Sequence, residues 1–278
     1  MARLSEVEAL PREGLRLGAL GRGALTRLLG SLSLIVIVLA WQLASTSGLV
    51  TPFLLPPISA VLERVWADAL SGDLAVNLGL TLYRTMVGFF VAGAAGIVIG
   101  ILMAKNAVVR WFFDPLVSVG FPMPKIAFLP IFMLWFGLYD FSKISMTVFN
   151  AIFPVITATM AATEGVEREM LWSAQSLGAS RRQLLWEIIL PSASPQILTG
   201  LQVALPVAMI VTIVTEMLMG GAGLGGAMIQ SSRFADSPGV FAGILEIAVA
   251  GLALVKGMAV LRHRLLAWHQ ETRDPTTV

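Results

Sequence analysis

The chain has 278 residues, of which 56% are hydrophobic and only 13% are charged. A soluble domain carries about 25% charged residues, so this composition and the mean hydropathy of +0.82 exclude an ordinary soluble protein. They predict an integral membrane protein. The protein is expected to be all-α, because the sequence lacks the repeated alternation of apolar and polar residues that is typical of a β-barrel. The absence of cysteine excludes disulfides, thiol chemistry and cysteine-ligated metals. The net charge of +2 is attributed to basic loops and not to nucleic-acid binding.

The N-terminal part of the chain is basic and then turns apolar. Residues 1–27 hold five arginines interrupted by proline and glycine, which predicts a cytoplasmic segment that can lie on the membrane surface. A first membrane span is expected at 28–44. A proline-rich turn at 51–57 precedes an amphipathic helix at 58–70, which is too polar to cross a membrane and is expected at the interface.

Five further apolar stretches complete a transmembrane domain of six spans at residues 28–261, followed by a basic tail at 262–278. They are 80–103, 112–138, 144–162, 197–219 and 240–261. The glycines of the second span predict close helix packing in lipid. Three prolines break the third stretch, and a broken helix at membrane depth must be buried in protein or line a cavity.

The distribution of lysine and arginine gives an orientation. With the N-terminus inside, the cytoplasmic segments carry fourteen basic residues and the external segments carry four. Cytoplasmic loops of membrane proteins carry the excess of positive charge. Both termini and the stretch 164–191 are therefore predicted to be cytoplasmic.

The stretch 164–191 is the longest charge-bearing interruption in the apolar second half of the chain. Met170, Leu171, Ala174 and Leu177 have the spacing of one helical face. Gly178 stands where a helix C-cap is expected, and a second helix is expected to run to Pro191. Such a helix pair is either a long loop or a docking element for a partner protein.

Three patterns in the chain do not indicate catalysis. The sequence 221–226 fits G-x-G-x-x-G, but it follows a membrane span and not the strand that a dinucleotide site requires, so it is interpreted as a re-entrant or flexible extracytoplasmic turn. No lysine lies in a G-K-[ST] motif, so any ATP must bind to another subunit. His263 and His269 share one basic tail, which is too little for a metal site.

Ionisable residues inside spans are costly and tend to face the bundle interior or a water-filled path. Glu216 lies in the fifth span and Glu246 in the sixth, and Glu216 shares a helical face with Gln202 and Met209. Glu216 is either a structural carboxylate bonded to the glycine-rich turn or a neighbouring helix, or a substrate contact. Lys125, among the three prolines, either attracts an anion or extends toward the interface.

The segment L-G-A-S-R-R-Q-L-L-W-E-I-I-L-P at 177–191 resembles the cytoplasmic loop of binding-protein-dependent ABC importer permeases. Gly178, Ile188, Leu190 and Pro191 match its pattern, whereas Ser-Ala-Gln at 173–175 replaces the usual Glu-Ala-Ala. Similarity extends over residues 54–269 through L-L-P-P-I-S-A-V-L, F-P-M-P-K-I-A-F-L-P-I-F-M-L-W-F-G, P-Q-I-L-T-G-L and T-E-M-L-M-G-G-A-G-L-G. These motifs look like the branch that imports taurine, alkanesulfonates, nitrate or bicarbonate, with related members that take pyrimidine vitamin precursors.

The resemblance implies a type I ABC importer permease in the bacterial cytoplasmic (inner) membrane. It implies a homodimer, two cytoplasmic ABC ATPase subunits that bind ATP and Mg, and an extracytoplasmic solute-binding protein. This chain itself is expected to hold no catalytic site, no cofactor and no metal. The resemblance assigns ATPase coupling to Val166, Met170, Leu171, Ala174, Leu177, Gly178, Ala179 and Ser180. For a small anion such as a sulfonate, the candidate pathway residues are Lys125, Gln202, Met209 and Glu216.

Two other classes remain open at this point. An ion-coupled secondary transporter would use Glu216 or Glu246 as a proton carrier, although no inverted repeat is evident. An intramembrane enzyme is a third possibility, for which no pair of nucleophile and base can be identified.

Overall fold

The computed structural model describes residues 32–33 and 35–267. The predicted segment 1–27, the start of the predicted span 28–44 and the tail from residue 268 onward lie outside the described residues. The chain divides into two units, residues 1–62 and 63–278, and each is described by itself.

The first unit contains an apolar helix, Ile35–Thr46, in the region of the predicted first span. The predicted proline-rich turn folds back onto this helix. Trp41 donates its Nε1–H to the Pro56 carbonyl oxygen at 2.9 Å, and Ser45 donates its hydroxyl to the Leu55 oxygen at 2.7 Å. The predicted amphipathic helix at 58–70 is confirmed as α2 (Ile58–Ser71).

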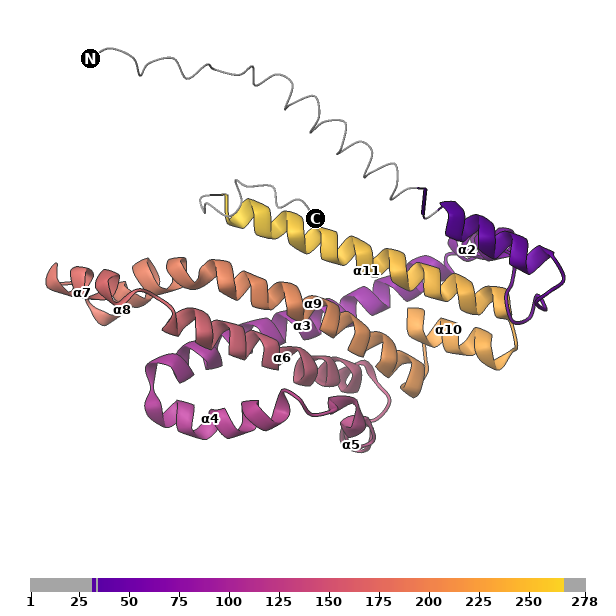
Figure 1. The fold of residues 1–278 in the computed structure, drawn as a ribbon. Coiled ribbons are helices and arrows are strands. Elements are labelled where there is room, and N and C mark those ends of the chain that lie inside the picture. Colours follow the sequence, from indigo (N-terminus) through magenta and orange to yellow (C-terminus); the bar gives the residue numbers. More distant parts are fainter. Residues whose placement is uncertain (1–31, 34, 268–278) are drawn as a thin grey trace, which may run out of the picture. The chain divides into compact units, whose positions relative to one another are not determined.

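The second unit is built around long helices (Figure 1). Among the described residues, four segments are long and apolar enough to cross a membrane. They contain α3 (Asp73–Lys105), α6 (Asp140–Glu164), α9 (Leu190–Met219) and α11 (Ser237–Leu265). The helical membrane fold is therefore confirmed, with four or five candidate spans among the described residues; the expected first span begins outside them.

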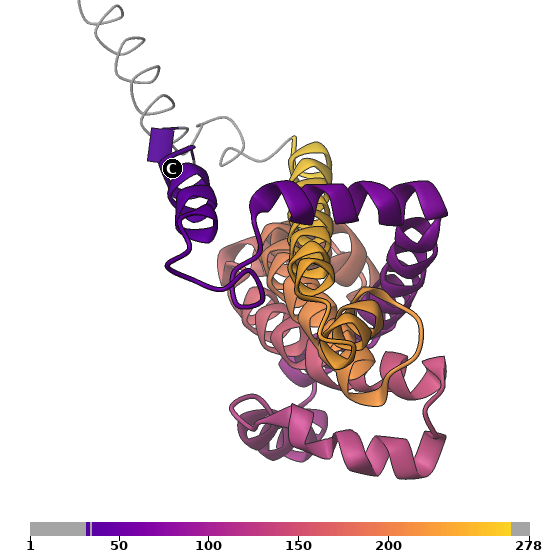
Figure 2. The same cartoon turned by 90° about the vertical axis from the view of Figure 1, so that its right-hand side faces the viewer.

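The predicted broken helix supplies the fifth candidate. α4 (Ala107–Gly120) is followed by the short 3₁₀ helix η1 (Lys125–Phe128) and by α5 (Leu129–Phe136), and the two halves meet at an angle of 99°. Pro122 and Pro124 occupy the break, where a helix cannot continue. Both views place α4 and α5 on the side of the bundle away from α11 (Figures 1 and 2).

Glycines on α3 form the seam with α6, as the sequence predicts. Gly88, Gly96 and Gly100 lie against Thr147, Val155 and Thr159, respectively. The difference in residue number between the two partners is the same in all three pairs, so α3 and α6 run parallel and in register. α9 runs antiparallel to α6, because Gly200 lies against Ala158 while Thr212 bonds Thr147 at 3.0 Å. Small residues thus bring three helices close together.

Two helices extend beyond the apolar spans that the sequence predicts. α3 begins at Asp73 and not near residue 80, and α6 begins at Asp140 and not at Ile144. Arg84 and Lys143, which the orientation count placed on the external side, are 4% and 2% exposed. Arg84 is paired with two carboxylates and Lys143 bonds the Gly220 carbonyl oxygen, so both charges lie inside the bundle.

The helix that was expected to end at Pro191 also continues. α8 (Arg181–Gln183) passes through a π-helical segment, η2 (Leu184–Ile189), directly into α9. In η2 the amide of Leu190 bonds the Leu185 carbonyl, five residues earlier. The wider winding accommodates Pro191, which lacks an N–H, in the first turn of α9.

Candidate functional site

The predicted docking element is a sharp helix–turn–helix at one end of the bundle (Figure 1). α7 (Arg168–Ser176) is followed by a turn at Gly178, whose φ of +85° is the left-handed conformation that glycine adopts without a steric penalty. Gly178 N–H bonds the Gln175 oxygen at 2.9 Å and Ala179 N–H bonds the Ala174 oxygen at 3.0 Å. This pair of bonds is a Schellman motif, so the turn is fixed by the backbone.

The helix after the turn has a capping box at its N-terminus. The Ser180 hydroxyl accepts from Gln183 N–H at 3.3 Å, and Gln183 Oε1 accepts from Ser180 N–H at 2.9 Å. This capping box has its N-cap at Ser180, two residues after Gly178, and α8 begins at Arg181. The angle between α7 and the following helix is therefore set within four residues.

The eight predicted coupling residues divide between two sides of this element. Val166 is buried, and Leu171, Ala174 and Ala179 pack with it against Leu184 and Ile197. The remaining four, Met170, Leu177, Gly178 and Ser180, face outward. Leu177 is 89% exposed. One side anchors the element and the other presents apolar surface.

The opposite end of the bundle holds a buried network of charges. Arg84 of α3 forms an ion pair with Glu216 of α9 at 2.6 Å and another with Asp140 of α6 at 2.7 Å. Glu216 has 0% exposure and also accepts from the Thr81 hydroxyl at 2.9 Å. A buried charge must be paired and hydrogen-bonded to be tolerated, and here one arginine neutralises carboxylates from two other helices.

The same network holds the glycine-rich turn between α9 and α10 (Leu224–Arg233). Arg84 donates to the Ala222 oxygen at 2.6 Å, and Lys143 donates to the Gly220 oxygen at 2.8 Å. Gly225 N–H bonds Glu216 at 3.1 Å. The turn is thus held by fixed polar contacts, and the second half of the predicted turn at 221–226 belongs to a helix that begins at Leu224.

Side chains of α3 bond the amides at the start of α10. Gly223 N–H bonds Asn77 Oδ1 at 2.8 Å and Leu224 N–H bonds the Thr81 hydroxyl at 2.9 Å. The first amides of a helix have no partner within the helix, and these side chains supply one. The sequence interpretation of Glu216 as a carboxylate bonded to the glycine-rich turn agrees with this geometry.

The four predicted pathway residues have separate surroundings. Lys125 donates to the Phe121 oxygen at 3.0 Å, and its Nζ lies 4.9 Å from the centre of the Phe153 ring. Gln202 accepts from Arg262 at 3.4 Å, while Met209 is buried next to Gly251. Glu216 is enclosed in the Arg84 network. Within one chain these residues do not converge on a common site.

Arg84 and Lys143 are the residues that sequence reasoning missed. Both were counted as external charges, although Arg84 falls inside the predicted second span. An arginine and a glutamate that each lie within a predicted span are a recognisable signal, because intramembrane charges usually pair with one another. That signal was available for Arg84 and Glu216.

Comparisons with known proteins agree with one another. The family described as binding-protein-dependent transport system inner membrane component matches residues 96–266. The taurine transport system permease protein TauC of Escherichia coli K12 is 36% identical over 247 residues, which cover 87% of this chain and 90% of that protein. The formylaminopyrimidine transport permease protein ThiX of Halalkalibacterium halodurans is 31% identical, over 87% of this chain and 96% of that protein.

A solved structure shows the same fold at low sequence identity. The crystal structure of an amino acid ABC transporter with histidines aligns with a TM-score of 0.55 and 18% identity, over 71% of this chain and 96% of that chain.

Proposed function

Because the chain belongs to the family of binding-protein-dependent transport system inner membrane components, we propose that two copies of it form the pathway of an ATP-driven importer. A separate ATPase subunit docks on α7 of each copy, on the cytoplasmic side. An extracytoplasmic binding protein delivers the solute to the other side. The chain is a multi-pass inner-membrane protein and a transport permease component.

The observation that carries this proposal is the construction of the docking element. Its backbone is fixed by the Schellman motif and the capping box, and Val166 and Leu171 attach it to the helix bundle. Leu177 is 89% exposed and Met170 is 46% exposed. A rigid element with an exposed apolar tip is suited to transmit movement from a partner to the spans. Ser173 replaces the family's usual acidic residue, so docking rests on shape and apolar packing.

For the solute, we propose a small sulfonate. Support comes from the similarity to TauC, whose name gives taurine as its solute. ThiX, whose name gives a formylaminopyrimidine as its solute, is less similar over the same share of this chain. Parallel uptake of labelled taurine, nitrate and a pyrimidine by cells that express the complete transporter tests this. Preferred uptake of the pyrimidine contradicts a sulfonate substrate.

Leu177→Ser tests the docking proposal without disturbing the fold, because this side chain is almost fully exposed. Burying a leucine at an interface contributes about 1.5–3 kcal/mol, so association with the ATPase subunit should weaken about tenfold or more. Leu177→Met, which keeps the apolar volume, should retain association. Both variants are compared for insertion into the membrane and for copurification with the ATPase. Unchanged association of Leu177→Ser contradicts the proposal.

Glu216 does not support the ion-coupled alternative. Its carboxylate is already bound by Arg84, Thr81 and the amide of Gly225. A proton carrier must exchange its proton during transport, whereas this carboxylate is held as the acceptor of several fixed bonds.

A further inference from the structure

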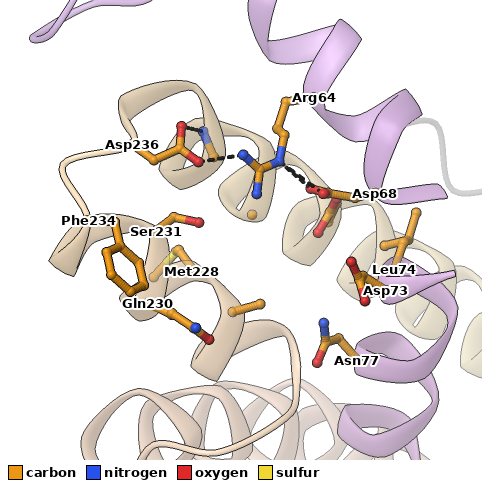
Figure 3. A pocket seen from close by; sticks show the side chains of 14 residues that line it. Arg64, Asp68, Asp73, Leu74, Asn77, Met228, Gln230, Ser231, Phe234 and Asp236 are labelled. Atoms are coloured by element: carbon orange, nitrogen blue, oxygen red, sulfur yellow. Dashed lines mark hydrogen bonds and ion pairs between the residues drawn. The ribbon is translucent and has the colours of Figure 1, made fainter. Parts of the chain in front are cut away.

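A polar chamber of about 360 Å³ lies among the ends of four helices, α2, α3, α10 and α11. It is at the end of the bundle away from α7. Figure 3 shows Arg64 between Asp236 and Asp68, with Asp73 and Asn77 below them. Arg64 Nε bonds Asp68 at 2.9 Å, and its Nη1 bonds Asp236 at 2.5 Å. Four carboxylates, those of Asp68, Asp73, Asp236 and Glu246, and one guanidinium line the chamber. The chamber therefore has an excess of negative charge.

Glu246 carries an unmet hydrogen-bonding requirement. Its Oε1 atom is shielded from solvent and has no hydrogen-bond partner among the described residues. A buried acceptor without a hydrogen-bond partner destabilises the structure, and a charged one does so more strongly. A ligand with an N–H donor at this position would remove this destabilisation.

An apolar groove of about 430 Å³ continues from the chamber and shares Leu74 and Glu246 with it. Leu78 and Leu82 of α3 form one wall. Val249, Ala250, Ala253 and Leu254 of α11 form the other. Both helices begin at the chamber end, so the groove follows them away from it. From Leu74 to Leu82 it extends ~12 Å at 1.5 Å per residue.

The chamber and groove lie at the depths expected of a lipid head group and its chain. α3 has 33 residues, a length of ~50 Å, which exceeds the ~30 Å of a bilayer's hydrocarbon core. We expect its first turn, with Asp73, to reach the head-group region, and the groove, which continues toward the middle of α3, to lie in the hydrocarbon region.

We propose that the chamber and the groove together bind one aminophospholipid. Its ammonium group lies among the carboxylates and donates to Glu246 Oε1, and one acyl chain fills the groove. Arg64 uses Nε and Nη1 for its two ion pairs, which leaves Nη2 for the phosphate. Phosphatidylglycerol, an anionic lipid, lacks the ammonium that the carboxylates require. This inference is independent of the transported solute and of the ATPase.

Charge complementarity also distinguishes the lipid from the N-terminal helix as the occupant. Residues 28–62 contain no lysine or arginine. That segment could cover the apolar groove but offers no cation to the chamber. A phosphatidylethanolamine supplies the cation, the phosphate and the chain in one molecule.

Native mass spectrometry of the full-length, delipidated protein tests the proposal. The probes are phosphatidylethanolamine, phosphatidylcholine and phosphatidylglycerol with identical acyl chains. The ethanolamine lipid should be retained at least fivefold more than phosphatidylcholine, which has the same charges but no N–H donor. Glu246→Gln should reduce this preference to less than twofold. Ala253→Trp, which fills the groove from an exposed position on α11, should lower retention about tenfold.

Ala248→Trp is the matched control, because Ala248 is exposed on the same helix but does not line the groove; it should retain the lipid. Equal retention of all three lipids overturns the proposal, as does full retention by Ala253→Trp. Free phosphoethanolamine that competes as well as the whole lipid would place binding in the chamber alone and overturn the role of the groove. If only a variant without residues 1–46 binds lipid, the N-terminal segment is the occupant and the proposal is wrong.

Discussion

Arg84 and Glu216 form an ion pair of 2.6 Å in which both side chains are almost completely removed from solvent. The two residues belong to α3 and α9. The guanidinium of Arg84 also forms an ion pair with Asp140 of α6. The network therefore links three helices at the end of the bundle opposite the docking element. It also fixes the turn that leads into α10.

Glu216→Gln should destabilise the protein strongly. Removing one partner of a buried ion pair typically costs about 3–5 kcal/mol, and the loss here should fall at the low end because Asp140 remains bound to Arg84. Thermal unfolding of the purified protein in detergent measures the effect.

The double variant Arg84→Met, Glu216→Leu is the informative comparison. Well-packed apolar residues often replace a buried pair at no cost, so this variant should recover much of the stability lost in Glu216→Gln. If Glu216→Gln unfolds at the wild-type temperature, the pair has no structural importance.

Gly223→Ala should be poorly tolerated. Gly223 has φ +126°, and a Cβ atom at this position would overlap the carboxyl group of Glu216. Backbone strain and overpacking together should cost about 2 kcal/mol or more.

Gly79→Ala is the control, because Gly79 lies within α3 with nothing near its Cβ position. This substitution should stabilise the helix by about 0.5–1 kcal/mol. In the same unfolding assay, Gly223→Ala should lower the free energy of unfolding and Gly79→Ala should raise it. Equal effects would contradict the close approach at Gly223.

The sequence predicts the helical membrane fold well because apolar length and small-residue spacing are local properties. The glycines of α3 and the prolines at the break after α4 were interpreted correctly for this reason. The helix start at Asp140 could not be predicted, because Lys143 indicates an external loop unless its buried contacts are known. Whether a charge is paired depends on helices distant in sequence. The same holds for Arg84, whose partners Asp140 and Glu216 lie 56 and 132 residues away.

Gly100→Ile should disrupt the seam between α3 and α6. A Cβ at Gly100 would lie 2.7 Å from Thr159 Cβ and 2.9 Å from the Ile156 carbonyl oxygen, so the helices must separate. Overpacking of this kind costs about 1–3 kcal/mol.

Gly257→Ile in α11 introduces the same side chain where nothing lies within 4 Å. It should leave the unfolding temperature nearly unchanged. If Gly100→Ile is equally well tolerated, the parallel packing of α3 on α6 is incorrect.

Pro191→Ala tests how the docking element is connected to its span. The π-helical segment η2 lies directly between α8 and α9, and Pro191 leaves the hydrogen-bond ladder open just after it. Alanine restores the N–H, which should allow the segment to close as α-helix and rotate α7 and α8 about the axis of α9. Transport should then fall about fivefold or more, the size of a typical coupling free energy.

Insertion and copurification with the ATPase should remain, because the exposed surface around Leu177 is unchanged. Pro195→Ala, one turn further on in regular α-helix, should retain transport. The measurement is ATP-driven uptake by the reconstituted transporter, compared with the ATPase rate of the same preparation. Loss of uptake with continued ATP hydrolysis would show that the connection transmits the movement. Wild-type uptake by Pro191→Ala would show that the winding of η2 is irrelevant to coupling.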